Sequence, residues 1–492
     1  MKRQRYSGQG VSVIAEPPSR YQLRLPLNEP PMVSAPVELL NVEETLSHLL
    51  RRDLTFNGQT TAYATHNVHA FAAKFPPQLP HLFISELTRP GEFVLDPMVG
   101  SGTTLVEAML AGRGGIGIDL DPLASLIAKI KSSPLDLPQC FHVGTLVLQQ
   151  ARSSLHPVTD DELQRTYPRQ AVEFFHYWFE DHSIAELYAL TRAIQAVKDA
   201  DPSATLRTSI HSFLQVVFSS VIITKSGGVT RARDLGHSRP HRDPNRKVER
   251  NALDVFKERL IAVIESLESV VDAPGRAWTV RADARRLPLA DSSVHLIVTS
   301  PPYAANAIDY MRAHKFSLMW LGHEPNTLTA LRREYIGAEL RSPTLELPSE
   351  TANSIIQTLR QKDEGRAAVV AYYFRDIETT LREMLRVTAE GRAVILVVGS
   401  STIRGVGIKA PTVVAELAAS VGFNVVGVAK REIVRGARMM PVSHKSSRTG
   451  IEARMHEEGV IGLIKPVWQI YGGVTDELAS LKDLTELFSF FP

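Results

Sequence analysis

The strongest constraint on the fold is a short apolar strand that runs through a turn with two glycines into a helix. Residues 92–96 (EFVLD) form the strand, and residues 103–112 (TTLVEAMLAG) form the helix. Residues 114–120 (GGIGIDL) and 121–132 (DPLASLIAKIKS) repeat this order. Strand–helix alternation of this kind predicts an α/β fold, with a mostly parallel sheet covered by helices on both faces.

The alternation stops after the second helix and resumes near residue 276. Residues 135–275 hold long stretches with apolar residues three and four positions apart, which predicts a large helical insertion. Five further apolar segments are expected as strands: residues 278–284, 294–303, 393–401, 423–433 and 460–466. The last two lie close together in sequence and can form an antiparallel pair near the edge of the sheet.

The chain has 492 residues, which is too long for one ordinary core. Residues 1–45 are rich in proline and polar residues, so we predict a poorly ordered segment there. Residues 46–134 are the first part of the α/β domain, residues 135–275 the helical insertion, and residues 276–492 the second part.

Composition excludes several classes of protein. Cys140 is the single cysteine, so the chain can form neither an internal disulfide nor a cysteine-based metal cluster. The histidines are not spaced like a zinc site, and we expect no metal. The first ten residues, MKRQRYSGQG, do not resemble a signal peptide, and there is no run of about 18 apolar residues. These features predict a cytoplasmic protein without a membrane segment.

Two motifs in the first part of the α/β domain are typical of a nucleotide-like ligand. The turn DPMVGSGTT starts at Asp96, and its glycines let a ligand approach the backbone and the helix N-terminus. Asp119 follows about 20 residues later, where an acid can accept both hydroxyls of a ribose. Asp121 stands before Pro122 and is expected to cap the next helix. A dinucleotide-binding motif would have its third glycine at position 105, where this chain has Leu105, so the interpretation as a dinucleotide site is weaker.

A third motif, SPPY, ends the strand 294–303. Ligands of open α/β sheets bind outside the carboxyl ends of the strands. Pro301 and Pro302 lack N–H groups, so their carbonyls are free to accept hydrogen bonds from an amino group. Tyr303 offers a flat face on which a base can stack. Each motif also has an ordinary structural interpretation, as a tight turn, a helix cap or, for Asp283 in the preceding loop, a solvated carboxylate.

Together, DPMVGSGTT, GIDLD, ADARRLPL and TSPPY resemble the amino-methylating DNA methyltransferases, which act on cytosine N4 or adenine N6. Their order and their places at strand ends also match, and the resemblance covers residues 66–131 and 278–466. It implies S-adenosyl-L-methionine as the cofactor and a seven-stranded, Rossmann-like sheet with one antiparallel strand near its edge. The helical insertion does not fit the family's common motif orders, so it is only a candidate region for target recognition.

The resemblance also implies roles for particular residues. Asp119 would bind the ribose and Asp283 the adenine of the cofactor, while the segment 66–87 would close over the methionine end. The implied cofactor-binding residues are Lys74, Phe75, Pro76, Asp96, Pro97, Gly100, Ser101, Gly102, Thr103, Asp119 and Asp283. The implied catalytic residues are Ser300, Pro301, Pro302 and Tyr303. Ser300 is typical of the cytosine-N4 branch, because the adenine-N6 branch usually has aspartate there.

This resemblance predicts a specific chemistry. Ser300 Oγ and the Pro301 carbonyl would accept the N–H groups of the amine and localise its lone pair for attack on the methyl donor. The base must first flip out of the duplex, which costs a few kcal/mol that stacking on Tyr303 partly recovers. Methylation at carbon 5 is set aside, because it needs a cysteine nucleophile and Cys140 lies within the insertion.

Two basic segments are candidates for binding phosphates. Residues 225–250 hold eight Lys or Arg against three acids, and residues 430–454 hold seven against two. Such segments can also be solvated loops. A helix after SPPY is expected to place Asn306, Asp309, Arg312 and His314 near the base, with Phe316 and Trp320 in the core. The predicted nucleic-acid-binding residues are Lys225, Arg231, Arg233, Arg239, Arg242, Arg246, Arg312, Arg435 and Arg438.

The sequence leaves several functions open. We expect double-stranded DNA with a flipped base as the partner, and a cognate restriction endonuclease or defence protein as a further one. The alternatives are adenine-N6 methylation, methylation of an RNA amine such as guanosine N2 or rRNA cytosine, and a silent nucleic-acid-binding module. The intact SPPY argues against a silent module, and a dinucleotide-dependent oxidoreductase would leave SPPY unexplained.

Overall fold

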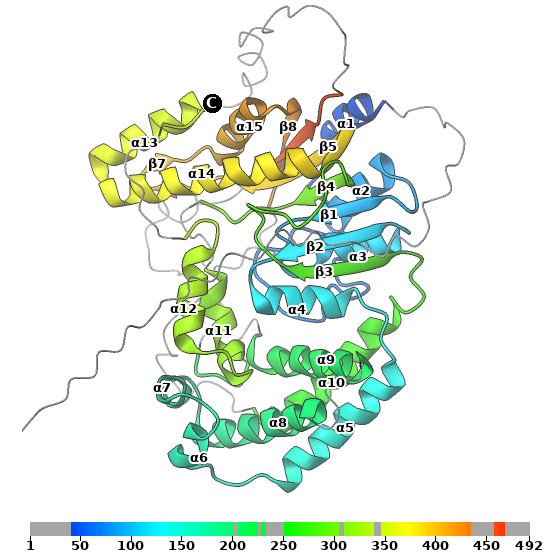
Figure 1. The fold of residues 1–492 in the computed structure, drawn as a ribbon, viewed down its shortest axis with the longest axis vertical. Helices are drawn as coiled ribbons and strands as arrows, with labels where there is room; N and C mark the ends of the chain where they lie inside the picture. Colours follow the sequence, from blue (N-terminus) through cyan, green and yellow to red (C-terminus); the bar gives the residue numbers. More distant parts are fainter. Residues whose placement is uncertain are drawn as a thin grey trace, which may run out of the picture.

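The computed structural model describes residues 41–199, 205–224, 228–232, 250–304, 309–338, 346–433 and 457–467. A seven-stranded sheet in the order β3-β2-β1-β4-β5-β9-β8 forms its centre (Figure 1). The strands are β1 (Phe93–Asp96), β2 (Gly114–Asp119), β3 (Arg276–Arg281), β4 (Val294–Thr299), β5 (Thr388–Gly399), β8 (Asn424–Glu432) and β9 (Glu457–Ile464). Strands β1 to β5 are parallel, and β9 runs antiparallel to β5 and β8. The predicted Rossmann-like sheet is confirmed, as is its antiparallel strand near the edge.

The strand order fixes where a ligand can bind. Strand β1 lies between β2 and β4, so the chain builds the sheet outward from β1 in two directions. In such sheets the binding crevice lies outside the carboxyl ends of the strands at this reversal. Asp96 ends β1 and Thr299 ends β4, and both therefore lie at the crevice.

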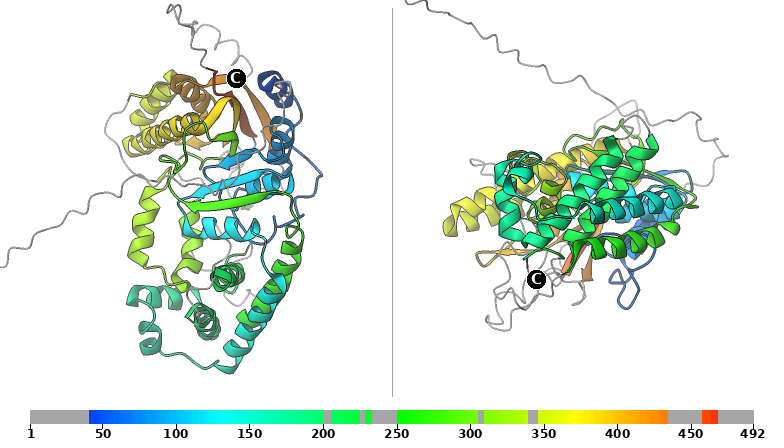
Figure 2. Two further views of the ribbon diagram at one scale, coloured as in Figure 1. Left: turned by 45° about the vertical axis from the view of Figure 1, so that its right-hand side comes forward. Right: turned by 90° about the horizontal axis from the view of Figure 1, so that it is seen from below.

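Helices cover both faces of the sheet, because side chains alternate between the faces along each strand. Val94 and Leu296 pack in one cluster with α1 and α2, whereas Leu95 and Ile297 pack in another with α14 and α15. The left view of Figure 2 shows these two sets of helices on opposite sides of the sheet. The helices of this α/β part are α1 (Val42–Leu50), α2 (Gln78–Leu87), α3 (Thr103–Leu110), α4 (Pro122–Lys131), α13 (Glu350–Lys362), α14 (Glu364–Val387) and α15 (Ala410–Val421).

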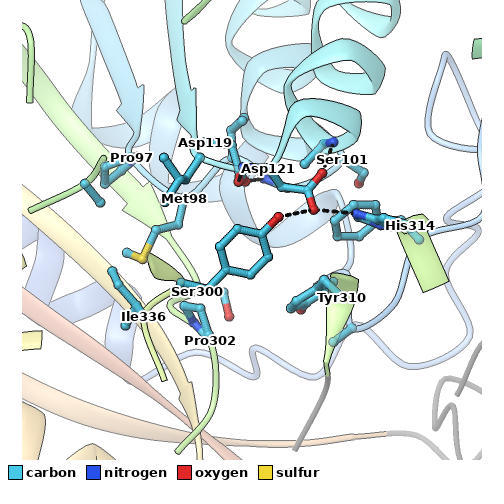
Figure 3. A pocket seen from close by; sticks show the side chains of 18 of the residues that line it. Pro97, Met98, Ser101, Asp119, Asp121, Ser300, Pro302, Tyr310, His314 and Ile336 are labelled. Carbon is cyan, nitrogen blue, oxygen red and sulfur yellow. Dashed lines mark hydrogen bonds and ion pairs between the residues drawn. The ribbon is translucent and has the colours of Figure 1, made fainter. Parts of the chain in front are cut away.

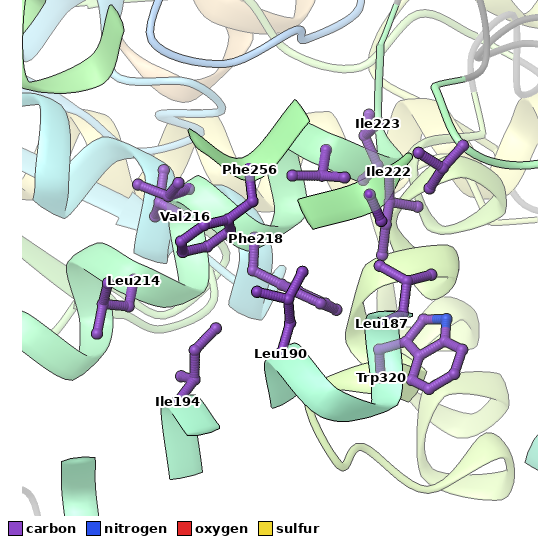
Figure 4. Packing of buried hydrophobic residues seen from close by; sticks show 14 of the residues in the cluster. Leu187, Leu190, Ile194, Leu214, Val216, Phe218, Ile222, Ile223, Phe256 and Trp320 are labelled. Atoms are coloured by element: carbon purple, nitrogen blue, oxygen red, sulfur yellow. The ribbon is translucent and has the colours of Figure 1, made fainter. Parts of the chain in front are cut away.

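The predicted insertion forms a helical body next to α4 (Figure 1). Leu123, Ile127 and Ile130 of α4 join the hydrophobic cluster of this body, so the body is packed directly against the α/β part. Figure 4 shows the interior of this cluster around Phe218, Phe256 and Trp320. The helices of the body are α5 (Leu137–Ser153), α6 (Asp160–Gln164), α7 (Arg169–Trp178), α8 (Asp181–Asp199), α9 (Thr205–Ile222) and α10 (Ala252–Glu268).

Two helices that follow SPPY are anchored in this helical body. They are α11 (Tyr310–Trp320) and α12 (Pro325–Glu334). Trp320 of α11 stacks on Phe175 of α7, with ring centroids 3.8 Å apart and planes 10° from parallel. Phe316 packs edge-on against Trp178, and both Phe316 and Trp320 are buried, which confirms their predicted place in the core. We call residues 309–338 the α11–α12 hairpin.

Some predictions concern residues that the structure does not describe. Residues 1–40 of the expected poorly ordered segment lie outside the described residues, and α1 already begins at Val42. A two-stranded sheet, β6 (Thr402–Ile403) with β7 (Val406–Gly407), follows β5. Among the described helices, none has the length and apolar character needed to span a membrane.

Candidate active site

Two glycines let the turn of the first motif, DPMVGSGTT, pack closely against helix α4. Gly100 and Gly102 both have positive φ values, of 49° and 82°. A Cβ at Gly102 would lie 3.0 Å from the Cα of Ala128 in α4, so the close packing of the turn on α4 requires glycine. Gly102 is also the N-cap residue of α3, so the N-terminus of that helix lies at the turn.

Asp96 is a buried carboxylate at the end of β1. It accepts hydrogen bonds from Thr299 Oγ1 at 2.6 Å and from the backbone N–H of Met98 at 3.2 Å. Burial raises its pKa to about 6, although the hydrogen bond from Thr299 opposes the shift. This contact joins the ends of β1 and β4, and thereby the first motif to the strand that carries SPPY.

The two aspartates of the second motif, Asp119 and Asp121, bind different backbone segments. Asp119 accepts from Gly100 N and Asp121 N, both at 2.9 Å, and its carboxylate therefore supports the glycine turn. Burial, followed by the charge of Asp121, raises the pKa of Asp119 to about 7. Asp121 accepts from Leu123 N and Ala124 N at 2.8 and 2.9 Å, which confirms the predicted helix cap.

A cavity of about 390 Å³ lies at the carboxyl ends of these strands (Figure 3). Its volume falls in the ordinary range for ligand pockets. Eleven of the fifteen predicted cofactor-binding and catalytic residues line it: Lys74, Phe75, Asp96, Pro97, Gly100, Ser101, Thr103, Asp119, Asp283, Ser300 and Pro302. Four others lie outside its lining: Pro76, Gly102, Pro301 and Tyr303. The structure thus brings the cofactor and SPPY motifs, which are distant in sequence, to one cavity.

Ser300 and Tyr303 of the SPPY motif lie in different environments. Ser300 Oγ donates to the Val397 carbonyl of β5 at 2.9 Å, so its lone pairs stay available as acceptors. The Tyr303 hydroxyl donates to Glu458 of β9, and a Cβ at Gly399 would meet the tyrosine ring at 2.9 Å. Burial and the charge of Glu458 raise the pKa of Tyr303 well above its usual value. Its proposed base-stacking role stays a prediction.

Asp283 has a strong partner that the sequence did not indicate. The guanidinium of Arg285 binds both carboxylate oxygens of Asp283, with the shortest contact at 2.8 Å. The same arginine donates to Asp376 at 3.0 Å and to the Glu334 carbonyl at 2.7 Å. Arg285 thereby links the loop before β4 to α14 and to the end of α12, and Asp283 still faces the cavity.

A buried lysine supports the glycine turn from behind. Lys131, the last residue of α4, has about 1% of its surface exposed, and its Nζ donates to the Ser101 carbonyl at 2.7 Å. Burial holds the pKa of its ammonium group well below the usual value. Glu107 of α3 is also buried and accepts from the rings of His66 and His81 at 2.7 and 3.0 Å. Neither contact has a local sequence signal.

The α11–α12 hairpin supplies the cavity wall that sequence reasoning did not assign to the cofactor. Its contributions are Asp309, Tyr310, His314, Thr329, Arg332, Arg333, Glu334, Tyr335, Ile336 and Ala338. His314, which the sequence predicts near the flipped base, lines this wall, and its buried ring places Nδ1 2.8 Å from Asp121. Its role toward a base stays a prediction. Asn306 lies outside the described residues. Phe71, Met98 and Leu120 add further apolar lining.

Two of the predicted nucleic-acid contacts can be located. Arg231 makes a two-point ion pair with Glu180 at 2.7 Å, which raises the arginine's pKa. Arg312 is 43% exposed and lies 3.6 Å from Asp309. Lys225, Arg233, Arg239, Arg242, Arg246, Arg435 and Arg438 lie outside the described residues.

Metal and thiol chemistry have little support in the described part of the chain. No group of three or more metal-binding side chains lies together there. Cys140 is buried in α5, and burial raises the pKa of its thiol to about 12, so the thiolate is disfavoured at neutral pH. It is not among the residues that line the cavity.

Comparison with known proteins shows which family this chain resembles. A family model described as "DNA methylase", of the N6/N4 methyltransferase type, matches residues 51–129. Type II methyltransferase M.MvaI of Kocuria varians is 24% identical over 404 residues, covering 74% of this chain and 83% of the relative. Type II methyltransferase M.BsoBI of Geobacillus stearothermophilus is 20% identical over 446 residues, covering 79% and 85%.

A third relative matches a shorter part of the chain more closely. Type II methyltransferase M.MjaII of Methanocaldococcus jannaschii is 34% identical over 123 residues, covering 24% of this chain and 23% of the relative. These matches agree with the sheet order, the glycine turn and the placement of SPPY at the end of β4. Together, the family model and the curated relatives support an amino-methylating DNA methyltransferase family for this chain, of the type that acts on cytosine N4 or adenine N6.

Proposed function

We propose that the chain transfers a methyl group from S-adenosyl-L-methionine to the N4 amine of cytosine in double-stranded DNA. The observation that carries this proposal is the environment of Ser300. Its hydroxyl hydrogen is donated to the Val397 carbonyl, so a neutral oxygen with free lone pairs is left at the cavity. This oxygen can accept an N–H of an exocyclic amine without placing a charge beside it.

The residues of the cavity fit an adenosyl cofactor. The glycine turn lets the ligand approach the backbone. Each oxygen of Asp119 accepts one backbone hydrogen bond, from Gly100 N or Asp121 N, so both oxygens can also accept from ribose hydroxyls. Met98, Leu120 and Pro302 offer apolar surface for the adenine ring. Lys74 belongs to the segment 66–87 and lines the cavity, and its Nζ donates to the His66 carbonyl at 2.8 Å. Its ammonium group would hold the carboxylate of the methionine end. S-adenosyl-L-methionine supplies the methyl group when it is bound.

The chain's own residues would activate and position the amine. Ser300 Oγ and the Pro301 carbonyl would accept its two N–H groups and favour a pyramidal nitrogen, whose lone pair then points at the methyl donor. Stacking of the flipped base on Tyr303 would hold the ring in place. Catalysis of this kind rests on orientation and on fixed dipoles rather than on a covalent enzyme intermediate.

The hairpin is the described surface best placed to contact DNA. Arg332 and Arg333 line the cavity at the end of α12, and Arg312 is exposed on α11. Arg332 pairs with Asp309 at 2.7 Å, whereas no ion pair is recorded for Arg333 among the described residues. We assign these arginines to the phosphates beside the flipped nucleotide.

Mass spectrometry of nucleosides from treated DNA tests the proposed function. The purified chain is incubated with methyl-labelled S-adenosyl-L-methionine and a mixed-sequence duplex, and N4-methylcytosine is the expected product. A product of N6-methyladenine alone would reject the cytosine assignment, and a methylated amine found only in RNA would overturn the substrate class. Methylome sequencing of expressing cells then gives the recognition site.

The named relatives support one proposed partner. Each of the three is described as a Type II methyltransferase. We propose by analogy that a restriction endonuclease with the same recognition site accompanies this chain. Neighbouring genes test this directly, because the nuclease is expected to be encoded beside its methyltransferase.

A further inference from the structure

Asp121 makes more contacts than a helix cap requires. Its Oδ1 caps α4 through Leu123 N and Ala124 N. Its Oδ2 has two different partners, His314 Nδ1 at 2.8 Å and the Tyr335 hydroxyl at 2.7 Å. Figure 3 shows His314 reaching Asp121 beside Asp119 and Ser101. One oxygen therefore serves the helix, and the other fastens the α11–α12 hairpin to the end of β2.

These contacts join segments far apart in the chain. His314 lies 193 residues and Tyr335 214 residues after Asp121. The side chains of Asp121 and His314 are only 5% and 4% exposed, so water does not compete for their contact. Burial alone would raise the pKa of Asp121, but the charge of His314 and the hydrogen bonds from His314 and Tyr335 lower it to about 2. The carboxylate is ionised, and its contacts are charge-assisted.

The fastened residues form one wall of the cavity. Tyr310, His314, Tyr335 and Ile336 all line it. A second contact holds the wall from the opposite side, because Phe71 stacks on Tyr310 with ring centroids 5.3 Å apart and planes 29° from parallel. The hairpin thus meets both the ribose motif and the segment 66–87 around the same space.

We infer that Tyr335 and His314 are positioning residues for the cofactor, which act through Asp121 by holding the hairpin wall against the adenosine end of the cavity. This inference rests on the proposed binding of S-adenosyl-L-methionine. If the wall is already in place, binding does not have to order it, and affinity rises accordingly. Both residues lie outside the four motifs that carry the family resemblance, and we assign neither of them a contact with the reacting atoms.

Calorimetry on the full chain tests this inference. Tyr335→Phe keeps the ring and removes the hydroxyl, and we expect about 5- to 20-fold weaker binding of S-adenosyl-L-methionine. The demethylated product, S-adenosyl-L-homocysteine, should lose affinity by the same factor, because the effect lies at the adenosine end. The KM for the cofactor should rise by a similar factor, whereas kcat at saturating cofactor should stay within about twofold.

The matched control is Tyr373→Phe. Tyr373 is fully buried in α14, and its hydroxyl has no hydrogen-bond partner among the described residues, so removing the hydroxyl should leave cofactor affinity unchanged. His314 provides a second test. Asn places an N–H close to the position of Nδ1, so His314→Asn should retain most of the affinity that His314→Ala loses.

Each outcome of the experiment decides one point. Equal cofactor affinity of the Tyr335→Phe and Tyr373→Phe variants would overturn the inference while leaving the proposed function intact. Failure of the unaltered chain to bind either cofactor form would reject the proposed function, and the inference with it. A Tyr335→Phe chain that is less stable to heat but has an unchanged KM would show a structural contact without a positioning role.

Discussion

Two neighbouring aspartates at the end of β2, the partly buried Asp119 and the buried Asp121, have opposite pKa shifts. Asp121 is held ionised by His314 and Tyr335, whereas the pKa of Asp119 is raised by burial and by the charge of Asp121, which two backbone donors and the charge of His314 only partly offset. The pKa of Asp119 is raised from 3.8 to about 7. On its own, this group contributes stability that is fully present below pH 3.8 and is lost as the pH rises through about 7.

Cofactor affinity should therefore depend on pH through Asp119. In the proposed complex, ribose hydroxyls would donate to the ionised carboxylate, so protonation of Asp119 would compete with binding. We expect affinity for S-adenosyl-L-methionine to be weaker at about pH 6 than at about pH 8, by at most about tenfold. Calorimetry at several pH values checks this. Asp119→Asn should bind weakly and lose the pH dependence, and an unchanged profile in that variant would assign the titration elsewhere.

Tyr303 can be tested by separating its ring from its hydroxyl. Tyr303→Ala removes the proposed stacking surface and should lose most methylation activity while keeping cofactor affinity. Tyr303→Phe removes only the contact with Glu458 and should keep activity within about tenfold of the unaltered chain. Steady-state kinetics with DNA measure both. If Phe were as damaging as Ala, the hydroxyl contact with Glu458, rather than the ring, would carry the function of this residue.

Ser300→Ala tests the chemical step. A lost hydrogen bond to the reacting amine should lower kcat by about 10- to 100-fold and leave cofactor binding unchanged. Single-turnover methylation and calorimetry together make the comparison. Weaker cofactor binding in this variant would instead mean that the bond from Ser300 to the Val397 carbonyl shapes the cofactor cavity.

At the scale of elements, sequence reasoning succeeded where the signal was local. The apolar strands, the glycine turn and the Asp121 cap before Pro122 all follow from residues close together in the chain. It missed the hairpin wall, because the pairing of Asp121 with Tyr335 spans 214 residues. The role of Lys131 was missed for a related reason. Its position at the end of α4 does not indicate that its ammonium group is buried and donates to the Ser101 carbonyl.

The hairpin offers a test of DNA contact at the end of α12. Replacing Arg332 and Arg333 with Gln should weaken binding to all duplexes and reduce the salt slope by about one per lost phosphate contact. Arg51 and Arg52 are a matched pair, because both are exposed at the end of a helix, α1, which packs against β8 instead of lining the cavity. Their replacement should leave the slope unchanged. Equal slopes for the two double variants would remove the hairpin from the DNA interface.

At the scale of the whole molecule, the helical body shares a packed core with α4 and with the α11–α12 hairpin. Trp320 belongs to the hairpin, yet it stacks on Phe175 of the body and its carbonyl accepts from the Tyr167 hydroxyl at 3.1 Å. The cavity wall is thus anchored to the insertion, and the insertion affects the site through packing. Sequence reasoning placed Trp320 in the core but gave no sign of which helices it joins.

Trp320→Ala should destabilise the chain by about 3–5 kcal/mol, because it leaves a large cavity at this junction. Thermal unfolding measures the loss. Tyr177→Ala is the control, because Tyr177 belongs to the same helical body but is 56% exposed. We expect this variant to change the free energy of unfolding by less than about 1 kcal/mol. A similar small effect at Trp320 would mean that the hairpin and the body are held together by other contacts.

The place of β1 at the centre of the sheet also has a consequence for the order of folding during synthesis. Asp96 and Thr299, which join the ends of β1 and β4, are 203 residues apart. Until β4 has left the ribosome, β1 can pair only with β2, and its other edge is open. The helical body lies between them in sequence and is built from contacts closer in the chain, so it can form first. While the insertion is being synthesised, one edge of β1 therefore stays unpaired and exposed to aggregation.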